Sequence, residues 1–421
     1  MKKTLLWLLL LSVTGLAQPA SQEVVLTAEE ALTRALQQHP QLKASQARLR
    51  QAEIAAGSAA TWPSAQAGLG SWQGRGDTLL NSNYISQNRS DYYLFVQQQL
   101  RPPGQNETRS KIAVQELEAS QAAARLLELQ IRQQVKDAYA ARLAADQQVR
   151  LSQENLQLAQ ELLQITELRF QAGTSPRLDG LNASIQKNRA DQELSAAQSQ
   201  LLQSQARLAP LLGLPASTNL RCTGELTPQP VSQVYESLCA LAKDHPRLQM
   251  ARSNLEASHH QRELAQQQGG PTPGVMAIYD LVRPSYAVQL TLSVPIDWGA
   301  LGAEVEHRAE VEKEKEQTLA AEELQLEADT GANFYAYQRA YDQAVAYRDK
   351  ILQPAEEVVK VTRYGYVRGA IAYNQLLIVQ QQLSTLRKEY VQRVLEVHQA
   401  LHALELVVGQ SLSRQNPEGK P

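Results

Sequence analysis

The sequence predicts a mainly α-helical protein with a small β part, made of two internal repeats that each contribute a long antiparallel coiled-coil hairpin and two strands. Ala, Gln, Leu and Glu dominate long stretches, and aromatic residues make up only 5% of the chain, which is typical of coiled coils and not of a thick globular core. The stretch 105–172 contains neither Pro nor Gly, and a helix of that length spans roughly 100 Å. The order of features in the first half also recurs in the second.

The two repeats are predicted at 18–220 and 221–413. Near their starts, Leu32, His39, Pro40, Leu42 and Leu49 match Leu238, His245, Pro246, Leu248 and Leu255. Near their ends, Gly173, Leu181, Leu208 and Gly213 match Gly369, Leu377, Leu404 and Gly409. Few residues are identical, so the shared order of the matches carries the prediction of two copies of one unit.

The first residues predict a signal peptide at 1–17. Lys2 and Lys3 precede the apolar run Leu5–Leu11, and Gly15-Leu16-Ala17 provides small residues for cleavage. The apolar run is too short to span a bilayer and stay as an anchor. We therefore expect an exported protein, with residues 414–421 as a disordered tail.

Each repeat is expected to open with a helix. Thr27 and Glu30 form a capping-box pattern for a helix over 27–58, which Pro40 is expected to interrupt. The matching helix of the second repeat is expected over 231–268, where Gly269-Gly270-Pro271 follows and stops it.

Two strands follow in each repeat, at about 62–72 and 91–100 and at about 274–281 and 286–294. In the last strand Tyr286, Val288, Leu290, Leu292 and Val294 share one face, whereas Ala287, Gln289, Thr291 and Ser293 share the other. This alternation fits a membrane-barrel strand and also a half-buried strand of a soluble sheet. The strands alone leave both interpretations open.

Long helices are predicted at about 105–172, 177–212, 303–367 and 372–408. In the first of them, Leu117, Ala124, Ile131, Ala138 and Ala145 recur every seven residues, and such a repeat keeps one seam facing a partner helix. Pro354 is expected to bend the third helix.

Strand number constrains the assembly if the strands lie in a membrane. Four strands cannot close a bacterial barrel, and an open sheet edge is not tolerated in lipid. The chain must then oligomerise, and a trimer supplies about twelve strands, enough for a water-filled lumen. The helical hairpins would continue this lumen as a periplasmic α-barrel.

The helix-hairpin turns resemble a known family. The first turn reads Arg169-Phe170-Gln171-Ala172-Gly173-Thr174, then Leu178-Asp179-Gly180-Leu181-Asn182-Ala183. The second reads Tyr366-Val367-Arg368-Gly369, then Asn374-Gln375-Leu376-Leu377, and a strand-to-helix junction reads Val294-Pro295-Ile296-Asp297-Trp298-Gly299. These segments resemble the TolC-like outer membrane efflux protein family, and the resemblance covers nearly the whole mature chain.

The resemblance implies a homotrimeric channel with a β-barrel in the outer membrane and a large periplasmic portion. Such a channel passively conducts substrates of a tripartite efflux or type I secretion system, and its partners are a periplasmic adaptor, an inner-membrane pump and outer-membrane lipid. The resemblance assigns adaptor docking at the tips to Phe170, Gly173, Thr174, Tyr366, Gly369 and Ala370. It also suggests a pore constriction at Asp179 and Gln375, where the second copy lacks the acidic residue of the first.

Other chemistry finds little support in the sequence. With 41 Lys and Arg against 43 Asp and Glu, the chain lacks the basic footprint of a nucleic-acid partner. No catalytic, cofactor or nucleotide motif stands out, and His398 and His402 fit a helix surface better than a metal site. Cys222 and Cys239 either pair in an oxidising compartment or stay as two thiols. The alternative function is a secreted coiled-coil structural or adhesion protein.

Overall fold

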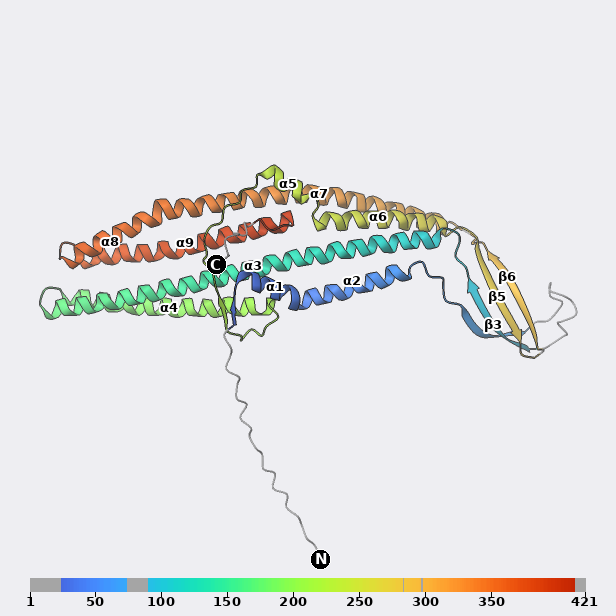
Figure 1. The fold of residues 1–421 in the computed structure, drawn as a ribbon, viewed down its shortest axis with the longest axis horizontal. Helices are drawn as coiled ribbons and strands as arrows, with labels where there is room; N and C mark the ends of the chain where they lie inside the picture. Colours follow the sequence, from blue (N-terminus) through green and yellow to red (C-terminus); the bar gives the residue numbers. More distant parts are fainter. Residues whose placement is uncertain (1–23, 74–89, 283, 297, 413–421) are drawn as a thin grey trace, which may run out of the picture. The chain divides into compact units, whose positions relative to one another are not determined.

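The structure is a computed structural model that describes residues 24–73, 90–282, 284–296 and 298–412. The predicted signal peptide at 1–17 and the predicted tail at 414–421 lie outside these residues. The described chain is mostly helical, with a few strands (Figure 1). This confirms the predicted fold class.

Apart from the short strands β1 and β4 and a π-helical segment, the elements follow the same order in both halves of the chain. The first half contains β1 (Val24–Leu26), α1 (Ala28–Gln38), α2 (Pro40–Ser58), β2 (Gln66–Gln73), β3 (Ser90–Gln99), α3 (Gln105–Gln171), α4 (Arg177–Leu211) and β4 (Leu220–Cys222). The second half contains α5 (Tyr235–Ala242), α6 (Pro246–Gln267), β5 (Thr272–Asp280), β6 (Ser285–Ser293), α7 (Ala300–Tyr347), the π-helical segment Arg348–Leu352, α8 (Gln353–Val367) and α9 (Tyr373–Val408).

The opening helix starts and breaks as its sequence predicts. The Thr27 hydroxyl accepts the Glu30 N–H at 3.3 Å, and Glu30 Oε2 accepts the Thr27 N–H at 2.8 Å, so the capping box is complete. The helix stops at Gln38 because His39 takes an extended backbone conformation, which a following proline favours.

The second repeat breaks at the same place, so the single helix expected over 231–268 was wrong. His245 is extended before Pro246 and separates α5 from α6. Its Nδ1 accepts the Arg247 N–H at 3.2 Å, and its Nε2 lies 3.0 Å from the Leu406 carbonyl. Since Nδ1 accepts, Nε2 carries the proton and donates, and the ring is neutral. Burial lowers the pKa of His245.

Helices account for most of the described residues. α3 runs unbroken for 67 residues, as the absence of Pro and Gly predicts. None of the described helices is both long enough and apolar enough to cross a membrane.

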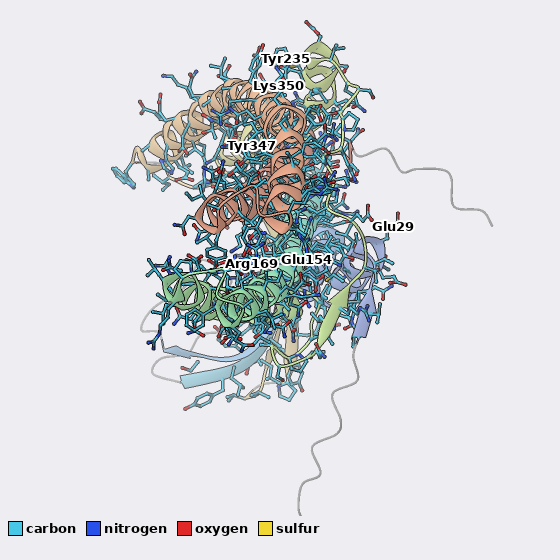
Figure 2. The ribbon with its side chains drawn as sticks, turned by 90° about the vertical axis from the view of Figure 1, so that its left-hand side faces the viewer. Glu29, Glu154, Arg169, Tyr235, Tyr347 and Lys350 are labelled. Carbon is cyan, nitrogen blue, oxygen red and sulfur yellow. The ribbon has the colours of Figure 1, made fainter. Side chains whose placement is uncertain are left out.

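The interruption expected near Pro354 is a π-helical segment, Arg348–Leu352, between α7 and α8. Proline lacks an N–H and cannot satisfy the carbonyl one turn earlier, so the backbone changes its hydrogen-bond pattern there. At the start of the segment, the buried Tyr347 hydroxyl donates to Glu389 Oε2 of α9 at 2.6 Å. Burial and the Glu389 carboxylate raise the pKa of Tyr347 to about 12. Tyr347 and Lys350 mark this segment in Figure 2.

The chain folds into two compact units that do not coincide with the sequence repeats. The tip unit holds the described residues of Met1–His39, Ile131–Gln229 and Arg339–Gln399. The sheet unit holds those of Pro40–Gln130, Pro230–Gln338 and Ala400–Pro421. Each repeat contributes segments to both units, so a repeat is not a domain with its own core.

The sheet unit contains one antiparallel sheet in the order β2-β3-β5-β6 (Figure 1). The strands begin within four residues and end within one residue of their predicted bounds. The tip unit contains a ribbon that the sequence did not predict, in which β1 pairs in parallel with β4. The buried Tyr139 hydroxyl donates towards the carbonyls of Leu26 and Thr223 beside it, at 3.0 and 2.7 Å.

Candidate functional site

One face of the four-stranded sheet is apolar and open to solvent in the single chain. The strand register aligns Leu69, Leu94, Tyr279 and Tyr286 in one row and Ala67, Val96, Ala277 and Val288 in the next. On β6 the exposure is greatest, with Tyr286 at 87% and Leu290 at 80%. A contiguous apolar face of this kind marks a surface that another apolar phase covers.

The opposite face of the sheet carries most of its polar side chains, and one apolar row of Gly68, Phe95, Ile278 and Ala287 crosses it. Gln97, Met276 and Gln289 form one of its rows. The rings of Phe95 and Tyr93 lie where side chains at the cross-strand Gly68 and Gly70 would otherwise stand. Aromatic side chains that cover strand glycines stabilise such positions. The sheet therefore has two chemically different faces, as the alternation in 286–294 predicts.

The two helix-hairpin tips have the same backbone geometry. At the end of α3, Gly173 has a φ of 69°, and the Thr174 N–H donates to the Arg169 carbonyl at 2.9 Å. At the end of α8, Gly369 has a φ of 78°, and the Ala370 N–H donates to the Gly365 carbonyl at 2.9 Å. This is the Schellman motif, whose positive φ favours glycine.

A small core joins the two tip hairpins. Its buried members are Leu162, Ala183, Tyr366, Tyr373 and Leu376. The Arg169 guanidinium donates to the Tyr366 carbonyl at 3.2 Å and lies 4.6 Å from the centre of its ring; Figure 2 labels Arg169. Burial, together with the neighbouring Tyr366 and Asp179, raises the pKa of Tyr373 to about 12.

The burial of Tyr366 contradicts its predicted role in adaptor docking. Its side chain is only 3% exposed, so it packs between the hairpins and is not available to an adaptor. The other predicted tip residues are exposed, and Phe170 is 49% exposed.

Sequence reasoning missed several exposed apolar residues near the tips. They are Leu168, Leu178 and Leu181 at the first tip and Val361, Tyr364, Val367 and Ile378 at the second. They lie outside the predicted coiled-coil seam, and apolar residues at such positions could have been identified from the sequence.

The predicted constriction residues differ in their surroundings. Asp179 lies in the first turn of α4, where its carboxylate accepts the Ser175 hydroxyl at 2.7 Å. A carboxylate there also interacts favourably with the helix dipole. Gln375 is exposed in the first turn of α9. Neither position by itself tests a pore constriction, which stays a prediction.

Polar side chains connect the α3–α4 hairpin to α8 and α9 within the tip unit. Arg387 of α9 donates to Glu356 of α8 at 2.8 Å and lies 3.6 Å from Glu154 of α3. Lys388 lies 2.6 Å from Glu193 of α4. These pairs are partly exposed, so each contributes about 0–1 kcal/mol. They fix the register of the hairpins more than they stabilise them.

The histidines and cysteines form no metal centre within the described residues. His398 Nε2 lies 2.9 Å from the Thr227 carbonyl. Cys222 and Cys239, whose pairing the sequence left open, are both free thiols in the structure. Burial raises the pKa of the Cys222 thiol to about 11, which makes it a poor nucleophile at neutral pH.

One known protein family matches most of the chain. The sequence model of the family described as outer membrane efflux protein matches residues 31–214 and 238–410. The match therefore falls in two segments, one in each predicted repeat. No curated protein sequence matches the chain.

Several solved structures share the fold. The outer-membrane channel OprN is 17% identical with a TM-score of 0.75, over 91% of this chain and 89% of its own. VceC, an outer membrane protein of Vibrio cholerae, is 17% identical with a TM-score of 0.73, over 92% of this chain and 97% of its own. The open state of the MtrE outer membrane channel of Neisseria gonorrhoeae is 16% identical with a TM-score of 0.74, over 92% and 90%. At these identities the likeness shows the fold.

Proposed function

The chain belongs to the outer membrane efflux protein family, and on that premise we propose that it is the passive duct of a tripartite efflux or type I secretion system. It is an efflux channel of the outer membrane with a large periplasmic part. The proposal adds that substrates reach it from a periplasmic adaptor and an inner-membrane pump, which supplies the energy. The observation that carries it is the sheet with one apolar and one polar face.

The oligomer follows from the strand count. The sheet contains four strands, and β2 and β6 are its edges. Lipid does not tolerate free backbone donors and acceptors at a sheet edge, so neighbouring copies must pair with both edges. Three copies would supply about twelve strands, enough to close a barrel around water. The apolar face with Val288 and Leu290 would then contact lipid, and the face with Gln289 would line the lumen.

The tips are the proposed docking site for the adaptor. The exposed apolar Phe170 lies beside the Gly173 turn, and exposed Val367 lies beside the Gly369 turn. Apolar side chains near a well-defined turn suit a helical partner whose apolar residues insert between them. Thr174 and Ala370 complete the two turns.

A narrow point in the lumen near Asp179 and Gln375 is also part of the proposal. Three copies of each residue would form a ring of mixed acidic and amide character. Replacing Asp179 with Asn would then lower the preference of the channel for cations in planar-bilayer recordings, whereas Asp191→Asn, farther along α4, would leave it unchanged. Equal selectivity of the three proteins would contradict a constriction at Asp179.

Deletion of the gene tests the transport role. Loss of tolerance to a set of metals, dyes or antibiotics would support efflux, and loss of a secreted protein would support type I secretion. Unchanged tolerance together with unchanged secretion would refute the proposed conduit.

A matched pair of variants tests the docking site. Phe170→Gln removes an exposed apolar side chain at the tip, whereas Leu202→Gln removes one about seven turns along α4. We expect both proteins to assemble normally, because exposed positions contribute little to stability. Only Phe170→Gln should fail to restore transport in the deletion strain. Full transport by Phe170→Gln would refute docking at this position.

A further inference from the structure

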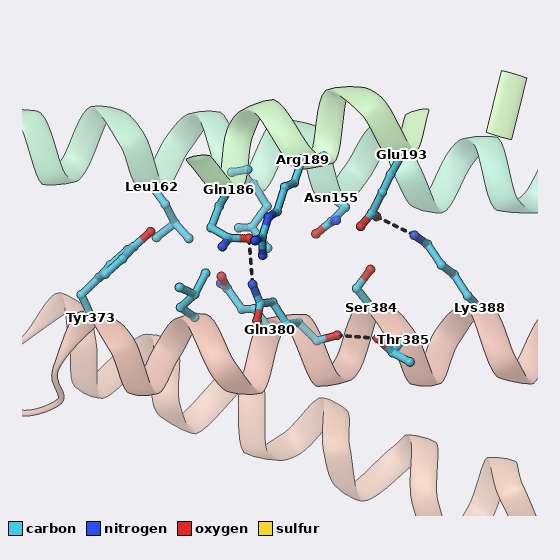
Figure 3. A pocket seen from close by; sticks show the side chains of 15 residues that line it. Asn155, Leu162, Gln186, Arg189, Glu193, Tyr373, Gln380, Ser384, Thr385 and Lys388 are labelled. Atoms are coloured by element: carbon cyan, nitrogen blue, oxygen red, sulfur yellow. Dashed lines mark hydrogen bonds and ion pairs between the residues drawn. The ribbon is translucent and has the colours of Figure 1, made fainter. Parts of the chain in front are cut away.

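Within the tip unit, α3, α4 and α9 line a polar cavity of about 300 Å³ that is partly open to solvent (Figure 3). Gln186 of α4 accepts a hydrogen bond from Gln381 of α9 at 2.7 Å. Farther along, Glu193 of α4 pairs with Lys388 of α9 at 2.6 Å. The cavity lies beside these two bridges, and neither the proposed conduit nor the proposed docking site uses it.

Two buried side chains that line the cavity have polar atoms without a hydrogen-bond partner. They are the Tyr373 hydroxyl and the Gln380 side-chain nitrogen, and their residues are only 5% and 8% exposed. An unsatisfied buried polar atom costs about 1–3 kcal/mol. Two such atoms at one cavity indicate that something else completes their hydrogen bonds.

The charge at the cavity is positive. Glu193 is neutralised by Lys388, so the Arg189 guanidinium is left in excess among the charged residues that line the cavity. Arg189 makes no hydrogen bond or ion pair with another described residue, and Figure 3 shows it extending from α4 over the cavity. Its planar set of donors matches a carboxylate.

Part of the wall is apolar, whereas Asn155, Ser384 and Thr385 add polar side chains to the rest. Leu158 and Leu162 of α3 and Leu377 of α9 contribute to the apolar part. The cavity volume lies at the lower end of the range for small-molecule binding sites. An inorganic anion would fill only part of this volume and would leave the apolar side chains without a contact. The cavity therefore suits a molecule with one acidic group and an apolar body.

We propose that this cavity binds a small organic carboxylate, whose acidic group contacts Arg189, Gln380 and the Tyr373 hydroxyl and whose apolar body contacts Leu158, Leu162 and Leu377. The ligand touches α3, α4 and α9 together, so it stabilises the packed arrangement of the two hairpins by mass action. The site lies within one chain, and its occupancy does not depend on transport or on an adaptor.

Equilibrium dialysis of the purified full chain in detergent against labelled benzoate tests the proposal. We expect saturable binding with one site per chain and at least tenfold weaker binding of the neutral analogue benzamide. Arg189→Gln should weaken benzoate binding at least tenfold, because it removes a charge-assisted hydrogen bond. Arg207→Gln removes the same charge from an exposed position of α4 outside the cavity and should bind like the unaltered protein.

Tyr373→Phe separates a ligand site from ordinary packing. The variant removes an unsatisfied hydroxyl, so the thermal midpoint of the benzoate-free protein should stay equal or rise. Its stabilisation by benzoate should nevertheless fall. Absence of saturable benzoate binding up to about 1 mM, or equal affinities for Arg189→Gln and Arg207→Gln, would overturn the proposal and leave the cavity as a hydrated space.

Discussion

The apolar face of the sheet gives a decisive test in two neighbouring residues of β6. Val288 lies on the apolar face and Gln289 on the polar face, and both are exposed near the middle of the strand. Replacing each with Lys places the same charge on opposite sides of one strand. Any difference between the variants therefore reports the environment of each face and not the strand propensity of Lys.

The expected magnitude depends on what covers the apolar face. A Lys that faces lipid near the middle of the bilayer costs about 2–4 kcal/mol, and three independent copies in a trimer would cost about 6–12 kcal/mol. A Lys at an exposed position in water changes stability by only about 0.5 kcal/mol in either direction. Val288→Lys should therefore prevent assembly, whereas Gln289→Lys, whose charge reaches a watery lumen, should be tolerated.

The assay follows assembly in the outer membrane. Membrane fractions are separated without heating, and the heat-sensitive oligomer is quantified on a gel. We expect a strong band for Gln289→Lys and little or none for Val288→Lys, although both chains are made. Equal assembly of the two variants would refute the assignment of the faces.

Three further predictions concern stability. Gly173→Ala should lower the thermal midpoint through a backbone penalty of about 1–2 kcal/mol, and no steric clash adds to it because a Cβ there meets no other atom. Gly180→Ala within α4 should instead stabilise the protein by about 0.5–1 kcal/mol. Calorimetry that ranks the two variants in the other order would contradict the turn geometry. Tyr366→Ala should cost about 3–5 kcal/mol as a core truncation, and a near-neutral effect in denaturant titration would contradict its burial. Burial lowers the pKa of His245, so the neutral ring contributes fully to stability above the ordinary histidine pKa of 6.5, and this contribution is lost as the pH falls below that value. As the pH is lowered, the thermal midpoint should therefore decline more in the unaltered protein than in His245→Gln. Parallel declines of the two proteins would contradict this prediction.

The elements that local chemistry determines could be predicted from the sequence. The Pro-free and Gly-free run gives α3 almost to the residue, and Gly173 and Gly369 mark both tips because few other residues adopt a positive φ. The alternation in 286–294 gives the two faces of β6. In each case, the deciding interaction lies within a few residues along the chain.

The remaining features depend on contacts between distant segments. Tyr366 was predicted to dock a partner, but its burial depends on Tyr373 and Leu376 across the turn and on Leu162 of α3. The β1–β4 ribbon pairs strands of only three residues, too short to show a period of two. The cavity beside Arg189 arises from the packing of three helices, which no single stretch of sequence encodes.

The four-stranded sheet argues against the alternative function, a secreted coiled-coil structural protein. Such a protein needs the heptad helices, and the sequence supplies them, but it has no use for a sheet that exposes Tyr286 and Leu290. In water, that face and the edges of β2 and β6 would promote aggregation. Glycines at 68 and 70, covered by aromatic rings on the opposite face, show that the sheet is shaped in detail on its polar side as well. A sheet with one face suited to lipid and the other to water fits a channel wall, because only there does each face meet its own solvent.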